Sequence, residues 1–192
     1  MLLGKCEGRV TELGRKLSKR VEPDDGALVA RSQAGDRRAF SELVRRHQTA
    51  VYRVCYRVLG DREDARDAAQ EAFIRAYGKI DTFQGRSAFR TWMLRLAVNV
   101  SLNERSRRRP LPPELLEADS GSGPEEAAVA ADEVARLHRA LRSLKPNHRA
   151  AVVLRDLEGL TYEEVAEALE VPPGTAKGWV SRGRRRLREL LL

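Results

Sequence analysis

The most constraining feature of the sequence is a pair of helical patterns joined by a short turn, between residues 161 and 190. Thr161 and Glu164 have the spacing of a capping box, which satisfies backbone N–H groups at the start of a helix. Residues 170 to 174 leave room only for a tight turn. Beyond it, apolar or small residues recur at intervals of four and three: Ala176, Val180, Gly183, Leu187 and Leu190. The sequence therefore predicts two packed helices in a helix-turn-helix.

The second of these helices has a basic outer face. Once the apolar stripe is buried, the residues left for solvent are basic apart from one serine: Lys177, Ser181, Arg182, Arg184, Arg185, Arg186 and Arg188. A merely solvated face is the simpler explanation, but it does not account for the capping box, the turn and the second stripe in series. Such a helix fits the major groove of DNA. One departure is Glu170, which stands where the turn needs a left-handed backbone and usually has glycine.

The first half of the chain also has helical periodicity. From Phe40 to Val58 the apolar positions repeat by three and four, which predicts a long core helix ending at Gly60, with Cys55 on its buried face. A second helix is expected from the cap Asp61 to about residue 77, and a third from near residue 87 to the basic run that Pro110 ends.

These patterns predict an all-α fold of two small helical domains, at 24–109 and 132–192. Residues 1–23 are a basic N-terminal extension, expected to be flexible, either an arm that contacts DNA or a solvated tail. Residues 110–131 are an extended acidic linker: from Pro110 to Glu133 inclusive the chain has seven acidic residues and no basic one. That acidity either confers solubility or mimics nucleic acid in a basic channel.

Composition limits the partners and the compartment. A net charge of +8 favours a polyanionic partner. Two cysteines, Cys6 and Cys55, do not make a disulfide framework, and we assign neither of them a role. No apolar run approaches the about 20 residues that span a bilayer, and no signal peptide is evident. We expect a cytoplasmic protein without membrane insertion.

Three segments together resemble the extracytoplasmic function (ECF) sigma factors of the sigma-70 family. They are DREDARDAAQEAFIRAYGKI at 61–80, FQGRSAFRTWMLRLAVN at 83–99 and LRDLEGLTYEEVAEALEVPPGTAKGWVSRGRRRL at 154–187. The resemblance implies that 24–109 is sigma region 2, which binds core RNA polymerase and the minus ten promoter element, and that 132–192 is sigma region 4, which binds the minus thirty-five element. It implies a transcription initiation factor that directs polymerase to promoters and promotes DNA melting, under stress or signal control by an anti-sigma factor.

The same resemblance assigns residues to three surfaces. The surface for core polymerase consists of Asp64, Asp67, Gln70, Glu71, Phe73 and Ile74. The surface for the minus ten element consists of Phe83, Gln84, Arg86, Ser87, Arg90, Arg95, Asn99 and Asn103. The surface for the minus thirty-five element consists of Thr175, Lys177, Gly178, Ser181, Arg182, Arg184, Arg185 and Arg186. Ordinary packing of alanines with a solvated acidic side is the alternative for the first surface. Trp92, spaced with Leu96, is expected in the core rather than as a base-stacking platform.

Two other classes of function compete with this one. A stand-alone helix-turn-helix regulator would use its first domain to sense a ligand or dimerise, but the acidic helix and the segment 83–99 argue against it. An enzyme is disfavoured because the chain has no GxxxxGK loop and no metal-ligand cluster, and because His47, His138 and His148 form no catalytic group. We therefore expect no catalysis, no cofactor, no metal and no small-molecule substrate.

Overall fold

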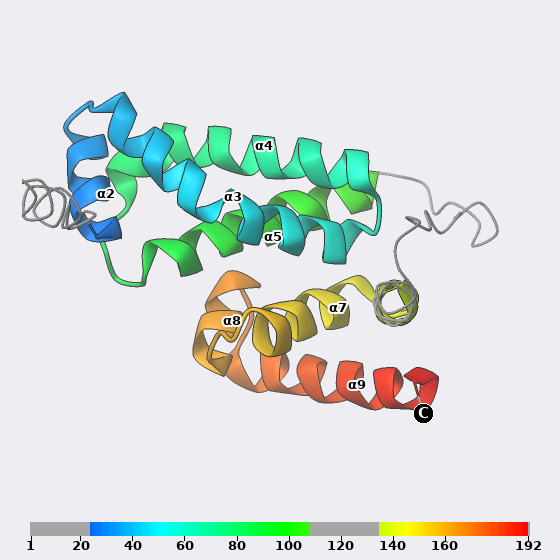
Figure 1. Ribbon diagram of the computed structural model, residues 1–192. Coiled ribbons are helices and arrows are strands. Elements are labelled where there is room, and N and C mark those ends of the chain that lie inside the picture. The colour runs from blue at the N-terminus through cyan, green and yellow to red at the C-terminus, as the bar shows by residue number, and fades with distance from the viewer. Residues whose placement is uncertain (1–23, 108–134, 192) are drawn as a thin grey trace, which may run out of the picture.

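The computed structural model describes residues 24–107 and 135–191, and all elements described in these two ranges are helical. They form two layers (Figure 1). The upper layer contains α2 (Asp25–Gln33), α3 (Arg37–Leu59), α4 (Arg62–Lys79), the short 3-10 helix η1 (Ile80–Thr82) and α5 (Phe89–Arg107). The lower layer contains a helix at 135–142, α7 (Pro146–Val152), η3 (Val153–Leu157), α8 (Tyr162–Ala168) and α9 (Pro173–Leu191). The all-α prediction is confirmed. The predicted extension 1–23 and linker 110–131 lie outside the described residues.

Aspartate caps fix where the helices of the upper layer begin. Asp24 accepts a hydrogen bond from the Ala27 N–H at 2.7 Å, and Asp61 accepts one from the Asp64 N–H at 2.9 Å. The long helix α3 ends at Gly60, whose φ of 84° is the left-handed conformation that glycine adopts readily. The core helix expected to end at Gly60 is therefore confirmed, and so is the burial of Cys55.

The core of the upper layer is formed where α3, α4 and α5 meet. The fully buried residues of α4 are all small: Ala65, Ala68, Ala69, Ala72 and Ala76. Small side chains let α4 lie close to its neighbours, which supply the larger buried residues, among them Leu43 and Val54 from α3 and Met93 and Leu94 from α5. Within the described helices, none is long and apolar enough to cross a membrane.

The lower layer contains the predicted helix-turn-helix. Thr161 and Glu164 form the capping box in both directions, at 3.1 and 2.8 Å, and start α8. Glu170 in the turn has a φ of 54°, so the expectation of a left-handed residue there is confirmed. A Cβ added to Gly183 would lie 2.5 Å from Cγ2 of Val152, so that glycine lets α9 approach α7 closely.

The apolar stripe of α9 ends earlier than the sequence predicts. Ala176, Val180 and Gly183 are buried and Leu187 is half-buried, but Leu190 is 38% exposed. The reason is length: α9 has 19 residues, whereas α7 and α8 have 7 each. At about 1.5 Å per residue, the two short helices do not cover the last turn of α9.

Candidate nucleic-acid interface and protein-docking face

The basic face predicted for α9 is present and faces solvent. The side chains of Lys177, Ser181, Arg182, Arg185 and Arg188 are exposed, and Thr175 and Gly178 are half-buried. A Cβ at Gly178 would lie 3.3 Å from the Arg182 guanidinium, so the missing side chain leaves room for that arginine to lie along the helix. The face has the shape and charge that suit a DNA groove.

Two arginines of the predicted minus thirty-five set also have partners within the protein. Arg184 donates to both oxygens of Asp156 in η3, at 3.0 and 2.5 Å, and this pairing raises the pKa of its guanidinium. Arg186 pairs with Glu189 at 3.0 Å, one turn along α9. Arg184 therefore helps to hold α9 against η3, which is a role that the sequence alone did not predict.

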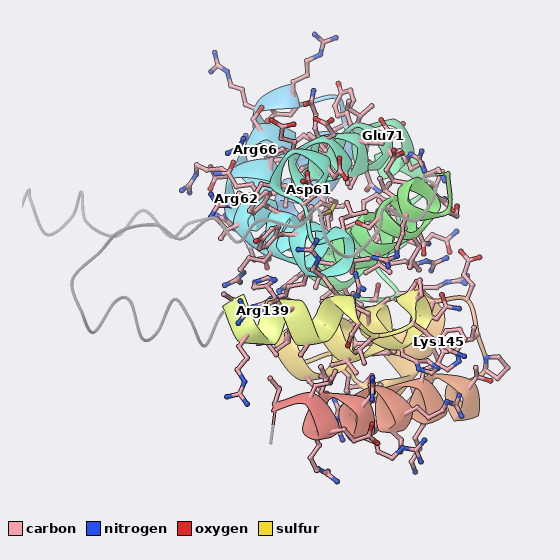
Figure 2. The ribbon with its side chains drawn as sticks, turned by 90° about the vertical axis from the view of Figure 1, so that its right-hand side faces the viewer. Asp61, Arg62, Arg66, Glu71, Arg139 and Lys145 are labelled. Atoms are coloured by element: carbon pink, nitrogen blue, oxygen red, sulfur yellow. The ribbon has the colours of Figure 1, made fainter. Side chains whose placement is uncertain are left out.

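The outer face of α4 presents the residues predicted to dock on polymerase. Asp67, Gln70 and Ile74 are exposed, while Asp64, Glu71 and Phe73 are half-buried. In Figure 2, Glu71, Arg62 and Arg66 lie in the upper layer, and Arg139 and Lys145 lie in the lower layer.

Two grooves run along α4, one with a mostly apolar wall and one with several carboxylates. The first, of about 670 Å³, lies between α3 and α4 and has an almost wholly apolar wall that includes Phe40, Val44, Phe73, Ile74 and Tyr77. The second, of about 530 Å³, lies between α4 and the end of α5 and includes the carboxylates of Asp64, Asp67, Glu71 and Glu104. Ile74 borders both grooves and is 58% exposed, and Tyr77, which also lines the first groove, is 47% exposed.

The loop between η1 and α5 is tied down and partly packed. Gln33 of α2 donates to the carbonyls of Ile80 and Phe83, each at 2.9 Å. The half-buried Phe83 ring contacts Phe89 and Trp92, with centroids 5.9 and 5.1 Å away. Trp92 is half-buried against the core, as predicted. Gln84 and Arg86 remain exposed, and Ser87 is half-buried.

The rest of the predicted minus ten set is divided between two places. Arg90 and Arg95, on α5, face the lower layer and pair with acidic residues of that layer. Asn99 is half-buried, and Asn103 lines the acidic groove beside Asp67 and Glu71. The structure therefore brings the loop and the start of α5 together but does not bring Asn103 to Arg90.

The contact between the two layers contains charged residues that sequence reasoning missed. Glu158, directly after η3, has a side chain that is 1% exposed and binds Arg57 of α3 at 2.9 Å and Arg90 of α5 at 2.5 Å. Thr91 donates to Glu164 at 3.0 Å, and Arg95 pairs with Glu167 at 2.9 Å. No local pattern identifies Glu158 as buried, because its partners lie 101 and 68 residues away in the sequence.

The histidines do not form a catalytic or metal-binding group in the described residues. Nε2 of His47 lies 2.7 Å from Asp25, and its ring packs on Phe89. His138 packs on Tyr56, and His148 on Trp179. Burial first, and nearby arginines second, lower the pKa of both His138 and His148. Among residues 24–107 and 135–191, no cluster of three or more His, Cys, Asp or Glu side chains is placed to hold a metal ion.

Comparison with known proteins agrees with this arrangement. Residues 43–110 match the family model of Sigma-70 region 2, and residues 135–187 match that of Sigma-70, region 4. The ECF RNA polymerase sigma-E factor of Haemophilus influenzae is 36% identical over 173 residues, which are 83% of this chain and 91% of that protein. The chain belongs to the ECF sigma factors of the sigma-70 family.

Other ECF sigma factors and related chains match to a similar extent. SigW of Bacillus subtilis is 32% identical over 85% of this chain and 94% of its own length. The sigma-H factor of Pseudomonas aeruginosa is 36% identical over 85% of this chain and 92% of its own length. The solved structure of CnrH in complex with the cytosolic domain of CnrY has a TM-score of 0.66 and 27% identity, covering 85% of this chain and 94% of that one. RpoE of Bartonella quintana, solved with the anti-sigma factor NepR, shares the fold, with a TM-score of 0.61 and 24% identity. The match covers 79% of this chain and 96% of that one.

Within this ECF sigma factor, the region 2 match includes α4, the loop and α5, and the region 4 match includes α7, η3, α8 and most of α9. The outer face of α4 and the covered start of α5 therefore belong to region 2. The basic face of α9 and the buried Glu158 belong to region 4.

Proposed function

We propose that this sigma factor binds core RNA polymerase through the outer face of α4 and binds promoter DNA through region 2 and the outer face of α9. One observation carries the proposal: the acidic and apolar face of α4 and the basic face of α9 lie on different units, and both remain exposed in the folded chain. One chain can therefore bind a protein on one side and a polyanion on the other.

The face of α4 suits a protein partner better than nucleic acid. The helix has no excess of positive charge, because its four basic residues are balanced by four acidic ones, and Ile74 and Tyr77, 58% and 47% exposed, offer apolar area beside the first groove. A partner with a basic and apolar helical surface complements both grooves. In the proposed assignment, that partner is core RNA polymerase.

The faces proposed for promoter DNA differ in chemistry. On α9, Lys177 and Arg182 are exposed near the start of the helix, where a recognition helix reads base edges, and Arg185 is placed to bind phosphate. In region 2, Gln84 and Arg86 extend from a loop held by Gln33, and an aromatic cluster lies beneath it. We propose that this loop and the start of α5 bind the melted minus ten element, with Arg90, Arg95 and Asn99 contributing polar contacts.

The proposal includes the setting in which the chain works. We expect it to catalyse no reaction by itself, to need no cofactor, and to act in the cytoplasm, where polymerase and chromosomal DNA are found. We also infer that a protein inhibitor of the anti-sigma kind controls it in response to a signal. Purification from native cells, in induced and uninduced conditions, without any stoichiometric protein inhibitor contradicts that inference.

Run-off transcription with purified core polymerase on a promoter library tests the proposal. Initiation should depend on this chain and should fall with either Arg182→Ala or Asp67→Arg. Polymerase binding, measured by gel filtration or anisotropy, should be lost only with Asp67→Arg. Asp81→Arg is the matched control, because it reverses one exposed carboxylate of region 2 that lies outside α4.

A stand-alone regulator makes the opposite prediction. It would protect duplex DNA tightly without polymerase and would give no initiation. The three relatives compared by sequence identity above are all named RNA polymerase sigma factors, so we do not favour this alternative.

A further inference from the structure

We propose that region 4 covers the DNA-binding side of α5 within the same chain, and that Glu158 is the residue that fastens this closed arrangement. The inference rests on the proposed function, because it takes the start of α5 as the surface for the minus ten element. It adds an intramolecular competition, because promoter DNA and the acidic residues of region 4 bind the same arginines of α5.

Glu158 is placed to fasten the two regions. Its buried carboxylate accepts from Arg57 on one oxygen and from Arg90 on the other, and Arg90 also donates to the main-chain carbonyl of Glu158 at 3.1 Å. Two helices of region 2 thus meet on one side chain of region 4. A buried carboxylate held by two arginines is strongly destabilised when either partner leaves, because the charge then stays buried without compensation.

The backbone before Glu158 supports this placement. Residues Val153–Leu157 form one turn of π-helix, and the Glu158 N–H donates to the Val153 carbonyl at 3.0 Å. A π turn inserts one residue more than an α turn and rotates the chain beyond it; such turns are frequent at functional positions. Here the turn ends at the residue that enters the contact between the regions.

Around Glu158, further acidic and polar groups of region 4 cover the neighbouring positions of α5. Glu164 accepts from Thr91, while Glu167 and Glu170 lie 2.9 and 3.8 Å from the Arg95 guanidinium. The side chains of Glu167 and Glu170 are 58% and 69% exposed, so each such pair contributes little stability. These pairs matter because of where they lie: the carboxylates bind the guanidinium group that a DNA phosphate would otherwise contact.

The closed arrangement leaves the other two surfaces free. The outer face of α4 and the basic face of α9 are exposed while Arg90 and Arg95 are engaged. A closed chain can therefore meet polymerase through α4, but it must open before α5 binds single-stranded DNA. We infer that region 4 suppresses binding of single-stranded DNA by the free chain.

The test uses the full-length chain and fluorescein-labelled single-stranded DNA of random sequence, at constant ionic strength. Glu158→Gln removes the charge that holds both arginines. Glu163→Gln makes the same charge change on α8 at an exposed residue, and is the matched control. We expect Glu158→Gln to increase the radius of gyration in X-ray scattering and to raise DNA affinity on the order of tenfold over the control, as a shift of the closed population predicts.

The outcomes separate this inference from the proposed function. If Glu158→Gln matches Glu163→Gln in both size and affinity, Glu158 does not fasten the chain. If the variant opens without a gain in DNA affinity, α5 is not a DNA-binding surface, which overturns that part of the proposed function and the competition with it. If Glu158→Gln does not fold by circular dichroism, the double variant Glu167→Gln, Glu170→Gln decides the question at exposed positions, with a smaller change in the same direction.

Discussion

The guanidinium of Arg149, on α7, lies inside the contact between the two layers and donates to the Val58 carbonyl at the end of α3, 2.7 Å away. It also donates to the carbonyls of Arg142 and Leu144. The side chain is fully buried, and its bonded partners are carbonyls rather than carboxylates. Burial first, and the charges of Arg105 and Arg142 second, lower the pKa of Arg149 to about 9. The C-terminal end of α3 carries partial negative charge, which compensates part of this cost.

Two substitutions of Arg149 should therefore distinguish how much its packing and how much its charge contribute to the free energy of unfolding. Arg149→Ala removes a large buried side chain and leaves carbonyl acceptors unsatisfied, so we expect the free energy of unfolding to fall by about 3 kcal/mol. Arg149→Met keeps most of the volume and removes the buried charge, so its loss should be clearly smaller. Urea denaturation of both variants measures the difference. Equal losses would mean that the hydrogen bonds, rather than the packing, dominate.

Gly183 marks the closest approach of α9 to α7. A methyl group there would meet Cγ2 of Val152 at 2.5 Å and the His148 carbonyl oxygen at 3.3 Å. We expect Gly183→Ala to lower the free energy of unfolding by about 1–3 kcal/mol, as overpacked cores do. Gly174→Ala is the control, because a Cβ there has no neighbour within 4 Å. Adding Val152→Ala to Gly183→Ala should cost less than the sum of the two single changes; strict additivity would contradict the predicted clash.

Glu170 stores backbone strain in the turn of the helix-turn-helix. With a φ of 54°, it occupies a region that glycine adopts without penalty. Glu170→Gly should raise the thermal midpoint, with a gain of about 0.5–1 kcal/mol. Glu170→Ala keeps the strain and should give no such gain. Calorimetry on the two variants makes the comparison, and a stabilised alanine variant would point to the side chain instead of the backbone.

Cys55 should be almost inert in the folded chain. Burial raises the pKa of its thiol to about 11, from an ordinary value of 9.0, and its Sγ faces the Ala97 carbonyl. At pH 8 the thiolate fraction falls by roughly a hundredfold, and the reagent is excluded as well. In a Cys6→Ser background, iodoacetamide should modify Cys55 only after denaturant is added. Rapid labelling of the native protein would show that the α3–α5 core opens readily.

The sequence by itself determined the helices, their caps and the polarity of their faces. The predicted caps Asp61 and Thr161 begin helices because a side-chain oxygen next to free N–H groups is a local relationship, whereas α2 and its cap Asp24 were not predicted. The basic face of α9 and the left-handed Glu170 are equally local, because helical spacing and turn length decide them. The separate matches to region 2 and region 4 agree with the predicted two-domain organisation.

Only the tertiary structure decided how the two domains meet. Glu158 looks like any loop carboxylate in the sequence, and it is buried because Arg57 and Arg90 converge on it from two helices of the other layer. Arg149 has no charged partner at helical spacing that would mark it as buried, yet its guanidinium lies against the end of α3. Burial of a charge depends on partners far apart in the chain and on the desolvation they offset, so the local pattern of side chains does not encode it.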